Sequence, residues 1–295
     1  MAEAYSDFAG VYDELMDNVP YETWGENIAA LIEEYGISRP VRDEETVAGE
    51  LAEEDLPEEE EEYREAVSEA LLASERNLVV DLGCGTGTLT ELLYRKGYDM
   101  IGIDSSAEML EVAMEKRARS GSEILYLQQD MRELELYSTV GTVISVCDCL
   151  NYLLEEEDLA EVFRLVNNYL YPGGLFLFDF NTVYKYRQVI GDTVIAENRE
   201  NCSFIWENYY HEEEEINEYD LTVFVQEEEE YFRRFTENHF QRGYTPETMC
   251  RLVEEAGMRV LRLLDADTLQ EITPESERIY VLAREQRKDA KTGET

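Results

Sequence analysis

A glycine-rich turn that follows an apolar run constrains this chain more than any other feature. Residues 77–82 (NLVVDL) are followed at once by Gly83, Gly85 and Gly87 in the sequence GCGTG. A run of this kind is typical of a strand that helices cover on both faces. Glycine lets the chain turn tightly and lets a ligand approach the backbone, and a helix that starts there aims its free N–H groups at the ligand. The pattern predicts a ligand site at the end of a buried strand.

Strand and helix patterns alternate from residue 77 to residue 182, which implies a parallel, doubly wound sheet. After residue 182, four aromatic and β-branched runs predict antiparallel strands. The predicted strands of the main sheet are 77–82, 99–103, 123–127, 141–147, 174–180, 258–264 and 278–284, and the helices are about 87–96, 106–119, 155–170 and 246–256. We therefore expect an α/β fold with a mostly parallel, seven-stranded, Rossmann-like sheet and an antiparallel β insertion.

The same pattern divides the chain into a main domain, residues 1–182 and 244–285, and a β subdomain, residues 183–243. Near the N-terminus Tyr5, Phe8, Tyr12 and Met16 recur at helical spacing, and a second helix is predicted at residues 25–35. Residues 41–65 are dominated by acids, so that we expect a solvated insertion there, with a helix from about residue 58 to residue 73.

Charge and cysteine usage limit the class of partner. The formal net charge is -43, which repels phosphate backbones and makes a nucleic-acid substrate unfavourable. No apolar run reaches the roughly 20 residues of a spanning helix, and the first residues do not resemble a signal peptide. Five scattered cysteines then fit free thiols in a reducing cytoplasm. Cys147 and Cys149 form a C-x-C without a second ligand pair, so we predict no metal site.

Acids at the ends of successive strands indicate the kind of ligand. A dinucleotide fingerprint needs glycine at position 88, which is Thr88 here, so NAD is disfavoured. Asp104 ends the second strand and can accept from both ribose hydroxyls, while Ser105 with Glu108 is expected to cap the next helix. Asp130 ends the third strand, where it can accept from an exocyclic amine. These features specify an adenosine without a pyrophosphate.

Four segments in this order and spacing, VVDLGCGTG, IGIDSSAEML, LQQDM and PGGLFLFDF, resemble the class I S-adenosylmethionine-dependent methyltransferases. The resemblance covers residues 77–182 well and is closest to bacterial small-molecule methyltransferases. It implies S-adenosylmethionine as cofactor and S-adenosylhomocysteine as product. It also implies a leading helix that closes over the cofactor and a β insertion that serves as substrate lid. Nothing from the family carries over to the acidic insertion.

The resemblance assigns the cofactor residues position by position. The residues implied are Asp81, Gly83 and Gly85 for the methionine part, Asp104 for the ribose, Asp130 and Met131 for the adenine, and Cys147 and Asp148 beside the sulfonium. Ser105 and Met109 are also predicted to bind the cofactor, Met109 by packing on the purine. Simpler interpretations stay open for three of these acids. Asp81 can merely stabilise the turn, Asp104 can merely begin a helix, and Asp130 can be structural.

The methyl acceptor is less well specified. His239 is a candidate general base and Tyr12 a candidate aromatic neighbour of the sulfonium. The residues predicted to contact the substrate are Asn151, Tyr152, Asn181, Trp206 and Arg242, although core packing is an alternative for the aromatic ones. The leading hypothesis is methyl transfer to nitrogen or oxygen of a small molecule. A protein or RNA methyltransferase and a non-catalytic S-adenosylmethionine-binding regulator are the alternatives, and the oligomeric state is not predicted.

Overall fold

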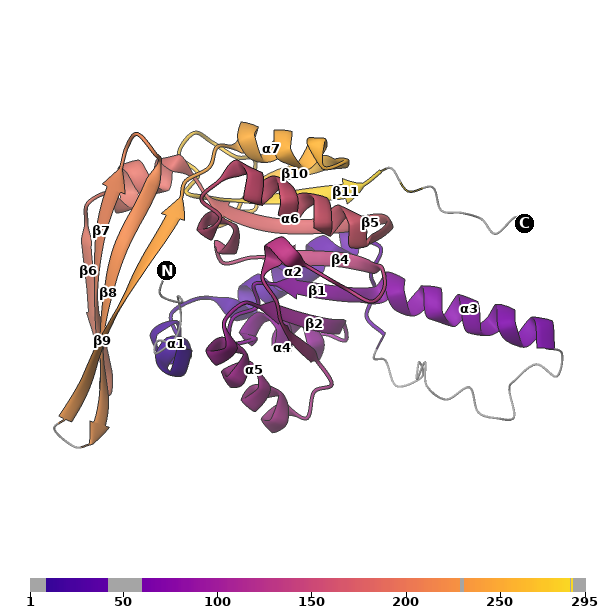
Figure 1. The fold of residues 1–295 in the computed structure, drawn as a ribbon, viewed down its shortest axis with the longest axis horizontal. Coiled ribbons are helices and arrows are strands. Elements are labelled where there is room, and N and C mark those ends of the chain that lie inside the picture. The colour runs from indigo at the N-terminus through magenta and orange to yellow at the C-terminus, as the bar shows by residue number, and fades with distance from the viewer. Residues whose placement is uncertain (1–8, 42–59, 229–230, 287, 289–295) are drawn as a thin grey trace.

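The computed structural model describes residues 9–41, 60–228, 231–286 and 288, which form two sheets with their helices (Figure 1). The helices and helical turns are α1 (Ala9–Leu15), α2 (Tyr21–Tyr35), α3 (Glu60–Asn77), α4 (Thr88–Arg95), α5 (Ala107–Ser120), η1 (Met131–Glu133), η2 (Cys149–Tyr152), α6 (Glu156–Tyr169), η3 (Lys185–Ile190) and α7 (Pro246–Glu255). The strands are β1 (Leu78–Leu82), β2 (Asp99–Asp104), β3 (Leu125–Gln128), β4 (Val140–Ser145), β5 (Leu170–Asn181), β6 (Val194–Asn198), β7 (Cys202–His211), β8 (Ile216–Glu228), β9 (Tyr231–Arg242), β10 (Met258–Asp265) and β11 (Arg278–Glu285). The predicted stripe positions Tyr5 and Phe8 lie outside the described residues, as does most of the acidic insertion.

The first sheet has seven strands in the order β10-β11-β5-β4-β1-β2-β3. Strands β3, β2, β1, β4 and β5 are parallel, and β11 pairs antiparallel with both β5 and β10. The chain steps outward from β1 to β2 and β3, then returns to the other side of β1 as β4. Doubly wound sheets bind ligands at such a switch point, beyond the carboxyl ends of the strands. The predicted fold class is confirmed.

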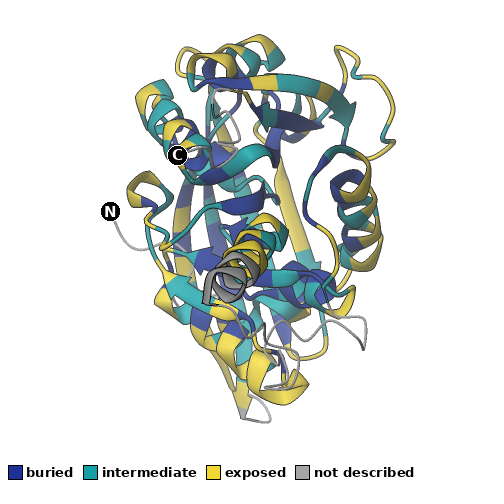
Figure 2. Ribbon diagram, turned by 90° about the vertical axis from the view of Figure 1, so that its right-hand side faces the viewer, coloured by how far each residue is buried: buried dark blue, intermediate teal, exposed yellow. Residues whose placement is uncertain are grey.

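Helices cover both faces of this sheet, which explains why its central strands are buried and mostly apolar. On one face α6 and α7 bury side chains such as Phe163 and Leu252, and on the other α2 and α4 bury Ile32 and Leu93. All six residues of β4 are buried. Figure 2 shows the buried residues concentrated in the strands and on the helix faces that meet them. None of the helices in the described ranges is both long and apolar enough to cross a membrane.

The second sheet has four antiparallel strands in the order β6-β7-β8-β9, which confirms the predicted antiparallel insertion. Cys202, Tyr219 and Leu221 on its inner face pack with Leu15 of α1. In Figure 1 the sheet stands at the left, α1 lies between it and the first sheet, and α3 extends from the opposite side.

Three local features differ from the sequence-based expectation. Helix η3 was not predicted, and α3 continues past residue 73 and leads directly into β1. The cap of α5 is Ser106 rather than Ser105, because the Ser106 hydroxyl accepts from the backbone N–H of Met109 (3.1 Å). This shift of one residue leaves the Ser105 side chain outside the helix, beside the ligand site described next.

Candidate functional site

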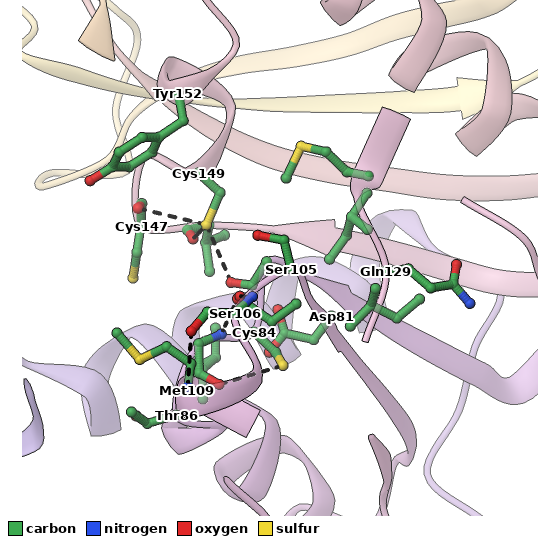
Figure 3. A pocket seen from close by; sticks show the side chains of 18 of the residues that line it. Asp81, Cys84, Thr86, Ser105, Ser106, Met109, Gln129, Cys147, Cys149 and Tyr152 are labelled. Carbon is green, nitrogen blue, oxygen red and sulfur yellow. Dashed lines mark hydrogen bonds between the residues drawn. The ribbon is translucent and has the colours of Figure 1, made fainter. Parts of the chain in front are cut away.

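A pocket of about 450 Å³ lies at the carboxyl ends of β1, β2 and β4 and beside the turn after β3. This volume is within the roughly 300–1,000 Å³ of small-molecule sites. Figure 3 shows that Gln129 and Tyr152 lie at opposite ends of the labelled lining residues. Of the residues predicted to bind cofactor, those that line the pocket are Asp81, Gly83, Gly85, Asp104, Ser105, Met109, Asp130, Met131 and Cys147.

The glycines after β1 serve two different purposes. All three have positive φ, 83° at Gly83, 53° at Gly85 and 72° at Gly87. A Cβ on Gly83 would lie 2.7 Å from the Cys149 sulfur, and one on Gly87 would lie 2.4 Å from the Tyr126 hydroxyl. A Cβ on Gly85 would meet nothing within 4 Å, and that residue lines the pocket. Two glycines therefore allow close packing, and Gly85 leaves its backbone open to a ligand.

Asp104 is fixed at the end of β2 by backbone amides. Its Oδ2 accepts from the Gly85 N–H (2.8 Å) and its Oδ1 from the Ser106 N–H (2.9 Å). Burial raises the pKa of this carboxyl, and these amide bonds oppose the rise. A carboxylate has about four acceptor positions, more than these amides fill. The carboxylate is therefore held in place, and it can still accept from hydroxyls in the pocket.

Asp81 is a buried acid next to the glycine turn. It is 2% exposed and accepts a hydrogen bond from the Thr90 hydroxyl (2.6 Å). Burial raises the pKa of Asp81 to about 7, and the negative charge of Asp104 adds to the rise. Burial of this kind favours the neutral form of a carboxyl, whereas a nearby cation favours the carboxylate.

Asp130 reaches the pocket but is already paired. Arg132 binds both of its carboxylate oxygens, with Nη2 donating to Oδ2 at 2.6 Å, and the same side chain lowers the pKa of Asp130. Met109 and Met131 also line the pocket. An adenine amine would share the carboxylate with Arg132, so the adenine role of Asp130 stays a prediction.

The turn after β4 has an unusual backbone that a buried acid stabilises. Cys147 and Asp148 both adopt positive φ, 67° and 53°. The Asp179 carboxylate accepts from both of their N–H groups, at 3.0 Å and 2.8 Å. Cys147 consequently lines the pocket, whereas Asp148 is not among the lining residues, and its carboxylate accepts from Gln241 of β9.

The thiols in the pocket are not activated nucleophiles. Burial raises the pKa of Cys84, Cys147 and Cys149 well above the usual thiol range. They remain neutral near pH 7, and a neutral thiol is a poor nucleophile. Within the ranges that the structure describes, no group of three or more histidine, cysteine or carboxylate side chains could hold a metal ion.

Of the predicted substrate residues, Tyr152 alone is among the described residues that line the pocket. Asn151 is fully buried, and its amide bonds the backbone of Asn181 and Arg242. The Asn181 side chain donates to Tyr186 and accepts from Lys185, and the Arg242 guanidinium donates to the Leu154 carbonyl. Trp206 packs on Tyr219 inside the second sheet. These four residues support the walls of the site.

Helix α1 connects the pocket to the second sheet. Tyr12 lines the pocket and also packs against the inner cluster of that sheet. Asp13 accepts from the Thr86 hydroxyl in the glycine turn (2.7 Å) and pairs with Lys116 of α5 (2.6 Å). The helix is thus tied to the glycine turn on one side and to the sheet on the other.

Some lining residues were not predicted from the sequence. Tyr21 begins α2, and Cys149 lies two residues after Cys147. The C-x-C spacing was considered as a metal pattern and rejected, although it could also have indicated a turn that brings both thiols to the pocket. His239 lies buried in the second sheet, within hydrogen-bond distance of Tyr152 (3.2 Å).

Comparisons with known proteins agree with this geometry. A family profile described as a methyltransferase domain matches residues 79–174. The protein YqeM of Bacillus subtilis (strain 168), which is named as a methyltransferase, is 32% identical over 95% of this chain and 96% of its own length. An S-adenosylmethionine-dependent methyltransferase structure from Clostridium acetobutylicum ATCC 824 matches with a TM-score of 0.75 and 26% identity, over 96% of this chain and 100% of that one. The sugar N-methyltransferase KedS8 from Streptoalloteichus sp ATCC 53650 shares the fold, with a TM-score of 0.59 and 17% identity over 76% of this chain and 85% of its own.

Proposed function

Because the chain belongs to the class I S-adenosylmethionine-dependent methyltransferases, we propose that it methylates a nitrogen or oxygen atom of a small molecule. The observation that carries this proposal is the cover over one end of the pocket. Tyr12 lines that pocket and packs with the inner face of the second sheet, beside Tyr219 and Leu221. A covered site favours a small methyl acceptor over a docked macromolecule. The sugar N-methyltransferase activity named for KedS8, a protein of the same fold, points the same way.

In this proposal the residues of the pocket hold the cofactor in three groups. Gly85 and Asp81 take the methionine part, with Asp81 opposite its ammonium group. Asp104 and Ser105 take the ribose hydroxyls. The side chains around the adenine are Met109, Asp130 and Met131, and Cys147 borders the sulfonium. The cofactor, when bound, supplies a methyl group that is already electrophilic. The protein's own residues therefore need only to align the methyl acceptor, exclude water and remove a proton.

A panel of methyl acceptors tests the proposal. The protein is incubated with methyl-labelled S-adenosylmethionine and small amines, amino sugars and hydroxyl compounds, and in parallel with bulk RNA and protein. We expect label in at least one small molecule and none in the polymers. Label in RNA or protein would replace the proposal with a macromolecular methyltransferase. Cofactor binding without any transfer would favour a regulator.

Asp81 gives a pH-dependent prediction. Its pKa of about 7 in the folded protein is above the ordinary value of 3.8, so the folded state holds this proton more tightly than the unfolded chain. The free energy of unfolding should therefore fall as pH rises from about 4 to about 7. Asp81→Asn keeps an acceptor for the Thr90 hydroxyl. Because asparagine does not ionise, the variant should not lose stability as the pH rises. We expect the variant to be more stable than wild type by about 4 kcal/mol at pH 8 and little changed at pH 4, measured by urea unfolding without ligand.

The same variant should bind S-adenosylhomocysteine roughly 10-fold more weakly at pH 8, because the ligand's ammonium loses its counter-charge. Calorimetry measures this affinity. A destabilised variant with unchanged affinity would instead show that Asp81 only stabilises the turn, which is the alternative that the sequence left open.

A further inference from the structure

A row of hydrogen-bonded side chains leads from the pocket into the second sheet. Tyr152 of η2 lines the pocket, and its hydroxyl lies 3.2 Å from Nδ1 of His239 on β9. The other ring nitrogen of His239, Nε2, lies 3.1 Å from Oε2 of Glu237 on the same strand. The row is shielded from solvent, since the side chains of His239 and Glu237 are 1% and 7% exposed.

The position of Glu237 selects one tautomer of the imidazole. A carboxylate only accepts hydrogen bonds, so it favours the proton on Nε2 and leaves a lone pair on Nδ1. That lone pair faces the Tyr152 hydroxyl, which can then donate its proton to it. Tyr219 of β8 fixes the ring from the side, because it stacks on His239 with centroids 4.8 Å apart and planes at 10°. The Tyr219 hydroxyl also lies 2.7 Å from that of Tyr152.

Tyr152 is the link between this row and the pocket. Among the described residues, no side chain of β6, β7, β8 or β9 lines the pocket. Figure 3 shows the Tyr152 ring at the edge of the site, next to Cys147 and Cys149 and far from Gln129. Cys147 marks the side proposed for the sulfonium, so the Tyr152 hydroxyl lies on the side where a methyl acceptor would enter.

We propose that Tyr152, His239 and Glu237 form a proton relay that removes the N–H or O–H proton of the methyl acceptor. The inference rests on the proposed function and names the groups that carry out its proton transfer. The acceptor's proton passes to the Tyr152 oxygen as the proton of Tyr152 passes to His239 Nδ1. The electron pair stays on the acceptor's nitrogen or oxygen, and Glu237 balances the charge of the imidazolium. The proton returns to water after turnover.

The three residues have different roles in this relay. Tyr152 is the group that touches the substrate, and His239 receives the proton through it. Glu237 is a positioning residue, because it acts only on the tautomer and charge of His239. The titratable groups that the structure places against the imidazole are Tyr152 from η2, Tyr219 from β8 and Glu237 from β9 itself.

The relay can be tested without a methyl acceptor, because the chain has only two histidines. His211→Gln removes the other one, which is exposed and pairs with Glu218, and leaves His239 as the only imidazole. Nitrogen-15 NMR of this protein, with S-adenosylhomocysteine added, should show the Nε2–H tautomer. Glu237→Met in this background should abolish that preference, and Tyr152→Phe should shift the Nδ1 resonance. Tyr209→Phe, an exposed tyrosine of the same sheet, is the matched control and should shift neither.

An Nδ1–H tautomer, or an imidazole that does not respond to Tyr152→Phe, would overturn the relay. With a methyl acceptor from the panel, Tyr152→Phe and His239→Asn should each lower kcat by roughly 100-fold or more, the usual range for a positioned base. They should also leave the affinity for S-adenosylhomocysteine unchanged. An unchanged kcat in both variants would equally overturn the relay. Failure of the proposed function is a separate result, since it appears as lost cofactor binding or as label in a polymer while the NMR result stands.

Discussion

Asp104→Ala should weaken the binding of S-adenosylhomocysteine by roughly 100-fold or more. The carboxylate can accept two charge-assisted hydrogen bonds from ribose hydroxyls, each with a typical contribution of about 1.5–3 kcal/mol. Its removal also leaves the N–H groups of Gly85 and Ser106 without their side-chain acceptor. The glycine turn should then lose part of its fixed geometry. Isothermal titration calorimetry at constant pH measures the loss.

Asp99→Asn is the matched control for this prediction, because Asp99 begins the same strand and lies at the end away from the pocket. We expect its affinity to stay within about 2-fold of wild type. Equal affinity in wild type and Asp104→Ala would show that Asp104 only begins a helix, as the simpler interpretation of the sequence holds.

Asp179→Ala should lower the free energy of unfolding by about 3–5 kcal/mol, the usual cost when one member of a buried charged pair is removed. Asp179 is fully buried on β5, where it accepts from the N–H groups of Cys147 and Asp148 and faces Arg278 (3.7 Å). Without it, the two amides lose their side-chain acceptor at a turn whose positive φ angles already cost energy, and the Arg278 guanidinium loses its buried counter-charge. Urea unfolding at pH 7 measures this effect.

The comparison for Asp179 is Asp267→Asn, which changes an exposed acid that faces the same arginine at 3.9 Å. Exposed ion pairs contribute about 0–1 kcal/mol, so this variant should be close to wild type. If Asp179→Ala were no less stable than Asp267→Asn, the turn after β4 would not depend on the buried carboxylate.

Local sequence patterns sufficed for the strands of the sheet and for the residues that line the part of the pocket proposed to hold the cofactor. Buried strands follow from short-range periodicity and the turn after β1 from its glycines, and Asp81, Asp104 and Asp130 lie at or just after the ends of neighbouring parallel strands. The edge of a parallel sheet brings such ends together, so the sequence alone could place Asp104 and Asp130 in one site.

The side facing the methyl acceptor could not be derived in the same way, because it depends on contacts between distant segments. Asn151 is a residue type that often contacts substrates. Its side-chain amide here donates to the Asn181 and Arg242 carbonyls, which lie 30 and 91 residues away in the sequence. Asp148 lies in the turn after β4, where its backbone adopts positive φ and its carboxylate accepts from Gln241 instead of lining the pocket. The role proposed for Glu237 depends on the burial of the β9 face that it shares with His239, and this burial could not be predicted from the sequence of a chain with 68 acids.

A crystal structure of the complex with S-adenosylhomocysteine tests the central claim most directly. The claim is that the glycine turn after β1 and the acid at the end of β2 together hold an adenosine. We predict both ribose hydroxyls within hydrogen-bond distance of the Asp104 carboxylate, and the adenine beside Met109 and Met131. A ligand bound elsewhere, with the Asp104 carboxylate facing water, would contradict the account.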